Sequence, residues 1–175
     1  MTVLTIWLGL RADLMMGDPH PMFLIRGGLL LLLGGGCGWA VLNMANPGVG
    51  EQGQAWKMAI AAAALLPLAA LVLAFHGQTA VAMANVRSGL ECLLYSSVTA
   101  LAVAAPILVW LRRGAPTSPA RAGWLTGVAA GGLGAFVYGL HCPFNDAVYV
   151  GFYYSLTVGL SAILGRILVP TLIRW

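Results

Sequence analysis

Charged residues are scarce in this chain of 175 residues: Asp, Glu, Lys and Arg together make up 8% of it, against about 25% in ordinary soluble domains. Hydrophobic residues reach 60%, and the mean hydropathy is +0.88. A soluble globule of this length needs a polar shell, and so few polar residues cannot build one. The composition therefore excludes a soluble domain and predicts an integral membrane protein.

Enzyme signatures are also missing. The sequence contains no Gly-x-Ser-x-Gly motif, no glycine-rich phosphate loop and no paired carboxylates within an apolar segment, the patterns that hydrolases and phosphate-binding enzymes carry. No acid or base lies at the centre of an apolar run, where a proton or ion transporter would hold one. We therefore expect that the protein is not an enzyme. The net charge of +4 is accounted for by the loops between apolar runs, so it gives no indication of a nucleic-acid partner.

Long windows without charge indicate several membrane-spanning helices. Five such windows cover residues 27–50, 58–86, 92–111, 122–145 and 147–165. A helix needs roughly 20 apolar residues to cross a bilayer core of about 30 Å. The sequence thus predicts an all-α fold, a polytopic transmembrane helical bundle that forms a single domain over 1–175. We expect its five full helices near 25–45, 57–76, 89–111, 122–141 and 147–168.

The first apolar piece is too short to span a membrane. Residues 1–10, MTVLTIWLGL, are followed by Arg11, and at about 1.5 Å per residue they reach about half way across the bilayer. We expect them to be either an interfacial stub or a truncated first helix.

Basic residues predict how the bundle is oriented. The loop over 112–121 carries Arg112, Arg113 and Arg121 and no acidic residue, and short cytoplasmic loops are enriched in Lys and Arg. The C-terminus falls on the same side after two further crossings. We therefore expect 112–121 to be a basic cytoplasmic loop, the C-terminus to be cytoplasmic, and 142–147 to be an outer loop.

This orientation gathers reactive side chains on the outer side. Cys92 opens one predicted helix and Cys142 closes the next, so an antiparallel hairpin would place both at the same depth. The histidines and one acidic residue also fall on this side: His141, His76, His20 and Asp146. Cys37 instead lies deep inside its helix, where a lone cysteine is usually a small apolar residue.

Two chemistries are open to the cysteine pair. Cys92 and Cys142 could form a disulfide if their Cα atoms come within about 7 Å. As thiolates they could also bind a soft or borderline metal ion, with His141 or His76 completing the ligand shell. The metal ligands predicted in this way are Cys92 and Cys142. A transiently bound heavy-metal ion is accordingly the one cofactor that the pattern suggests.

Glycines are abundant, and their spacing indicates close helix packing. Gly127 and Gly131 lie four residues apart in GVAAGGLGAF, and small residues at this spacing let helix backbones approach closely in membranes. Exposed faces of this kind would also permit a homodimer.

Several stretches resemble the NrsF-type family of bacterial membrane proteins, negative regulators of extracytoplasmic-function (ECF) sigma factors. The resemblance rests on LRRGAP, on the small-residue helix that ends in HCP, and on SGLECLL upstream, with a weaker match at GLRADL. It implies a six-helix anti-sigma factor of the bacterial inner membrane with both termini in the cytoplasm. Such a protein holds an ECF sigma factor on the cytoplasmic side and releases it when a signal reaches the outer side. The resemblance makes Cys92 and Cys142 the sensing cysteines, with heavy metals and oxidising stress as signals.

Two departures from the family pattern accompany this resemblance. Family members begin with a cytoplasmic stretch and a full first helix, whereas this chain starts inside that helix, so we expect the sigma-binding N-terminal stretch to be missing from it. After HCP the family usually shows acidic residues, where this chain has Phe144, Asn145 and Asp146. Asp146 is then the one oxygen ligand that this loop offers to a metal.

Two other functions compete with this interpretation. A small metal-ion transporter or channel component would use the His and Cys face as its entry site, and metal accumulation in cells expressing the chain would reveal it. In a structural membrane subunit, the cysteines could be replaced without consequence.

Overall fold

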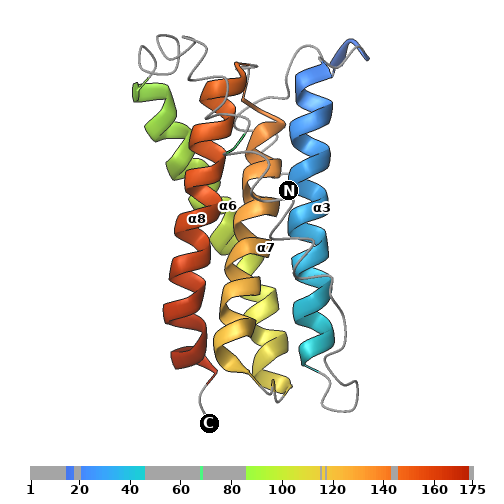
Figure 1. The fold of residues 1–175 in the computed structure, drawn as a ribbon, viewed down its shortest axis with the longest axis vertical. Coiled ribbons are helices and arrows are strands. Elements are labelled where there is room, and N and C mark those ends of the chain that lie inside the picture. Colours follow the sequence, from blue (N-terminus) through green and yellow to red (C-terminus); the bar gives the residue numbers. More distant parts are fainter. Residues whose placement is uncertain are drawn as a thin grey trace.

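The computed structural model describes residues 15–17, 21–45, 68, 86–114, 116, 118–142 and 146–173. Within these ranges the protein is helical, as predicted, and four long helices lie along the long axis of the molecule (Figure 1). They are α3 (Pro21–Met44), α6 (Val86–Arg113), α7 (Pro119–Gly139) and α8 (Ala147–Leu172). The helix predicted near 57–76 and the truncated helix predicted at 1–10 lie outside the described residues. The described part therefore shows four helices and not the expected five with a partial one.

The helices extend beyond the charge-free windows that predicted them. α3 begins at Pro21 rather than near residue 25, and proline suits the first position of a helix because its missing N–H is not needed there. Arg26, which bounded the predicted helix, lies inside it. α6 likewise includes charges at both ends, from Arg87, whose Nε lies 3.6 Å from Glu91 Oε1, to Arg113. A window without charge reports the apolar part of a helix and misses its charged turns.

α7 lies at the centre of the described bundle. It contacts α3, α6 and α8, and most of its residues are buried. Among the described residues, α3, α6 and α8 are the helices that are long and apolar enough to cross a membrane. The predicted spanning segment near 122–141 is thus a helix, but one of lower hydropathy. Its glycines and alanines face neighbouring helices, so protein rather than lipid covers much of its surface.

Close backbone contacts hold α7 against its neighbours, as the glycine spacing predicted. A methyl group added to Gly127 would collide with the carbonyl oxygen of Ser161 on α8, and one on Gly131 would lie 2.9 Å from the Cα of Val158. One on Gly134 would lie 2.7 Å from the Cα of Ala100 on α6. Small residues therefore allow these helices to approach at backbone distance.

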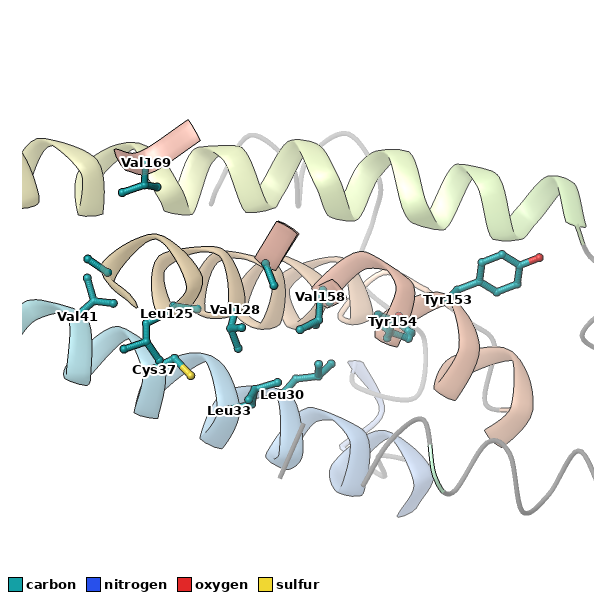
Figure 2. Packing of buried hydrophobic residues seen from close by; sticks show 14 of the residues in the cluster. Leu30, Leu33, Cys37, Val41, Leu125, Val128, Tyr153, Tyr154, Val158 and Val169 are labelled. Carbon is teal, nitrogen blue, oxygen red and sulfur yellow. The ribbon is translucent and has the colours of Figure 1, made fainter. Parts of the chain in front are cut away.

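Apolar side chains fill the space between α3 and α7. Figure 2 shows Leu33 and Cys37 of α3 on the side toward α7, near Leu125 and Val128. Cys37 is fully buried in this cluster, as expected for a small apolar residue. The core runs the length of the bundle, so α3 and α7 are in contact along most of their length.

The two ends of the bundle carry different chemistry. α3, α6 and α8 begin at the end where α7 finishes, the upper end in Figure 1. This end holds Cys92 and Cys142, and we call it the cysteine end. The opposite end holds Arg112 and Arg113, and we call it the basic end. α6 and α7 run from one end to the other in opposite directions, so each connects the cysteine end to the basic end.

Candidate functional site

Cys92 and Cys142 meet at the cysteine end, although they come from different helices. Cys92 lies in the second turn of α6, and Cys142 lies three residues after the end of α7. The two side chains are hydrogen-bond neighbours, and both thiols are free. Their exposed fractions are 0% and 2%. The structure thus brings together the two cysteines that the sequence singled out, in a buried and reduced state.

The turn after α7 fixes the position of Cys142. The helix ends at Gly139, and the backbone N–H groups of His141 and Cys142 then both donate to the carbonyl of Tyr138, at 2.9 and 3.1 Å. The last carbonyls of a helix lack partners within it, and these bonds use one of them. The expectation that Cys142 closes a helix reaching 141 is therefore corrected. Cys142 lies just beyond the helix, in a turn whose N–H groups still donate to the carbonyl of Tyr138.

Polar contacts tie α6 to α7 beside the pair. The Sγ of Cys92 lies 4.0 Å from the Oγ of Ser96, one turn further along α6. Thr99 then donates from Oγ1 to the carbonyl of Gly134 on α7 at 2.9 Å. Such hydrogen bonds between membrane helices contribute about 0.6 kcal/mol on average. The bond from Thr99 joins α6 to α7 below the two thiols, whereas the contact of Cys92 with Ser96 lies within α6.

Aromatic residues of α8 surround the pair. Tyr149 and Tyr154 are almost fully buried, and both lie close enough to the two cysteines to interact with them electrostatically. The ring of Tyr153 packs against Gly89 of α6, where a side chain on the glycine would collide with it. Aromatic rings of α8 therefore enclose the two cysteines and limit the access of water to them.

Sequence reasoning missed one buried charge at this site. Arg26 of α3 is 1% exposed, and its Nη2 donates to the carbonyls of Gly139 at 3.1 Å and Cys142 at 3.3 Å. In the sequence, Arg26 marks only the start of a charge-free window. Its place at the edge of an apolar helix was the available signal, because an ionisable residue in a membrane segment is a functional candidate by default.

The remaining predicted residues have separate outcomes. Asp146 caps α8: its Oδ1 accepts a hydrogen bond from the N–H of Tyr149 at 2.8 Å. His141 is half-buried in the turn next to Cys142. His20 and His76 lie outside the described residues. Within the described residues, no three His, Cys, Asp or Glu side chains are grouped so that they could hold a metal ion.

The basic end lies far along the bundle from the cysteines. Arg112 donates from Nε to the carbonyl of Leu172 at 3.1 Å, which ties the end of α6 to the end of α8. Arg113 and Arg121 are exposed. The three arginines predicted for this loop therefore share one end of the bundle, and all three side chains are exposed.

Comparison with known proteins gives a consistent picture. The family model described as "NrsF: Negative regulator of sigma F" matches residues 1–175. The chain is 33% identical over 175 residues to the probable anti-sigma-F factor NrsF of Azospira oryzae, covering 96% of this chain and 79% of that protein. It is 31% identical over 176 residues to the anti-sigma-F factor NrsF of Caulobacter vibrioides, covering 97% and 80%. No solved structure shows a significant match.

Proposed function

This chain belongs to the NrsF family of negative regulators of sigma F, and we propose that it is an anti-sigma factor switched by its cysteine pair. It would hold an ECF sigma factor on the cytoplasmic side and release it after an extracytoplasmic metal or oxidative signal. The role of the family is regulatory and not enzymatic. The observation that supports the switch most directly is the pair of free, buried, neighbouring thiols of Cys92 and Cys142.

Oxidation of the pair is the simplest switching reaction. Two thiols lose two protons and two electrons and form one S–S bond. Hydrogen peroxide that accepts both protons and both electrons is reduced to two molecules of water, and an organic hydroperoxide is reduced to one alcohol and one water. The non-bonded sulfur contact would shorten to a bond of about 2.05 Å, so the start of α6 and the turn after α7 would be drawn together.

Metal capture would act on the same residues. A soft heavy-metal ion would displace the two thiol protons and bind both sulfurs, and this too would fix the distance between Cys92 and Cys142. His141 directly precedes Cys142 and could supply a further ligand, and His20 and His76 remain candidates for the same role. Both signals would thus converge on one geometric change at the cysteine end.

α7 is the natural carrier of that change. It connects the turn that holds Cys142 to the basic end, where α6 finishes with Arg112 and Arg113. Its contact with α8 consists of small residues around Gly127 and Gly131, so few bulky side chains interlock and resist a small shift along the helix axis. A displacement at the cysteine end would thereby reach the basic end, where the sigma factor would be held.

The proposed location is the bacterial inner membrane, with the basic end and the C-terminus in the cytoplasm. The three apolar helices support membrane insertion, and the exposed arginines support this orientation. Exposed glycines of α3, Gly28 and Gly35, would permit a second copy to pack closely in a homodimer.

Co-purification with the sigma factor encoded beside the chain tests the proposed function. The sigma factor should be retained by reduced membranes and released by a thiol oxidant or a heavy-metal salt. Replacing both Cys92 and Cys142 by Ser should abolish release, whereas Cys37→Ala is a matched control that should leave it intact. The anti-sigma role would be wrong if no sigma factor bound to the full-length protein, and the cysteine mechanism would be wrong if the double variant responded normally.

A further inference from the structure

Arg26 is a fixed positive charge inside the bundle. It lies in the second turn of α3 and is 1% exposed. A charged side chain at mid-membrane depth costs about 2.5–3.5 kcal/mol on insertion scales, and one near a helix end costs less but still needs partners. Arg26 is in contact with Cys142 and is therefore a candidate functional residue. The reaction of the two cysteines does not by itself involve it.

The hydrogen bonds of Arg26 join α3 to the end of α7. Nη2 reaches the carbonyl of Gly139, the last residue of α7, and the carbonyl of Cys142 itself. The C-terminal carbonyls of a helix carry the negative end of its dipole, so a cation there is stabilising. Arg26 therefore holds the one turn that has to move when Cys142 bonds to Cys92.

Aromatic rings fix the guanidinium in place. Its central carbon lies 5.4 Å from the ring centroid of Phe23 on α3 and 5.5 Å from that of Tyr154 on α8. A cation within about 6 Å of a ring centroid is attracted to the face of the ring. One side chain thus bridges α3, α7 and α8 beside the cysteine pair, while α6 contributes Cys92.

We propose that Arg26 is the positioning residue that couples the cysteine pair to α3. The inference rests on the proposed function and extends it. When Cys142 is pulled toward Cys92, its carbonyl moves relative to Arg26, and the hydrogen bond between them is lengthened or lost. The contact between the first turns of α3 and the end of α7 is then weakened. In this way, the formation of a bond between Cys92 and Cys142 also changes the packing of α3.

Comparison of the reduced and oxidised states tests this coupling. The full chain carrying Cys37→Ala would be treated with diamide in membranes, and disulfide formation would be followed by loss of maleimide labelling. Hydrogen exchange at the start of α3 and retention of the sigma factor would be measured on the same samples. With Arg26 present, oxidation should change both by about fivefold or more, the lower end of usual allosteric couplings.

Arg26→Gln is the decisive variant. It should form the disulfide to the same extent, but hydrogen exchange at the start of α3 should no longer differ between the two states, and oxidation should no longer release the sigma factor. Arg26→Lys, which keeps the charge, should restore part of the difference. A merely structural role would lower stability in both states equally and leave the difference between them unchanged.

The outcomes separate this inference from the proposed function. If Arg26→Gln shows the same oxidation-dependent change at α3 as the parent, the coupling role is overturned. If Arg26→Gln does not accumulate in membranes, Arg26→Met, which also removes the charge and the donors, takes its place, and a response equal to that of the parent would again overturn the coupling role. If the parent binds no sigma factor, the proposed function fails, while hydrogen exchange at α3 still judges Arg26 by itself.

Discussion

The side chains of Cys92 and Cys142 are hydrogen-bond neighbours although fifty positions separate them in the chain. The antiparallel course of α6 and α7 produces this meeting, because the start of one helix and the end of the next share one end of the bundle. Both thiols are free and buried. A reaction at either sulfur therefore acts on two helices at once, which is what a switch between two states of a bundle requires.

Oxidation should produce an intramolecular disulfide. In a Cys37→Ala background, diamide should remove both remaining thiols from reaction with a maleimide-polyethylene glycol after denaturation, and a reductant should restore them. The reason is that the two side chains already lie in contact and the turn holding Cys142 lies outside the helix. A further Cys142→Ser change is the control and should leave Cys92 open to the maleimide. Disulfide-linked dimers in place of an internal bond would contradict this expectation.

The two ends of the bundle should lie on opposite sides of the membrane. Arg87 at the cysteine end and Arg113 at the basic end are both exposed, so single cysteines placed there in a chain without native cysteines should be open to reagents. A membrane-impermeant maleimide should label Arg87→Cys in intact spheroplasts and Arg113→Cys only after permeabilisation. The reverse pattern would show that the proposed orientation is inverted.

The sequence predicted the four described helices and the placement of Cys92 and Cys142 at one end of the bundle, for physical reasons that also explain what it missed. Apolar windows report where lipid covers a helix, so they located α3, α6 and α8 but cut off charged turns such as those with Arg87 and Arg113. The sequence also predicted α7 as a helix. Its hydropathy is lower because it lies at the centre of the described bundle, and a charge-free sequence window does not reveal that position.

The position of a residue along its helix axis can be counted from the sequence, whereas its contacts with neighbouring helices cannot. Counting placed Cys92 and Cys142 at the same end, yet it could not show that their side chains touch. Arg26 was read as a boundary because its partners are backbone carbonyls of α7, and no motif encodes a backbone carbonyl. Asp146 was taken as a possible ligand because its capping bond to Tyr149 depends on where α8 begins.

Enlarging Gly127 should destabilise the bundle. In Gly127→Leu the new side chain would collide with the Ser161 carbonyl and the Cα of Ala162 on α8, and overpacking of this kind typically costs about 1–3 kcal/mol. Gly159→Leu is the matched control, since that glycine is an exposed residue of α8 with no atom near its missing side chain. Thermal unfolding in detergent should show a lower midpoint for Gly127→Leu alone. Equal midpoints for the two variants would contradict the α7–α8 contact described here.

Two replacements of Asp146 distinguish a helix cap from a metal ligand. Its Oδ1 accepts from the Tyr149 N–H at 2.8 Å, and loss of such a cap typically costs about 1 kcal/mol. Asp146→Ala should therefore lower the midpoint of thermal unfolding, while Asp146→Asn, which caps about as well, should keep it.

If Asp146 acts only as a helix cap, Asp146→Asn should also leave the response to heavy metal unchanged, because the amide preserves the hydrogen bond and only the charge is lost. A carboxylate that binds metal behaves differently, because the neutral amide is a weaker ligand for a cation. The measurement is the metal concentration needed for half-maximal sigma-factor release. If that concentration rises in Asp146→Asn while the unfolding midpoint is kept, Asp146 is a ligand, and the N-cap of α8 supplies an oxygen donor in addition to the sulfur of Cys142.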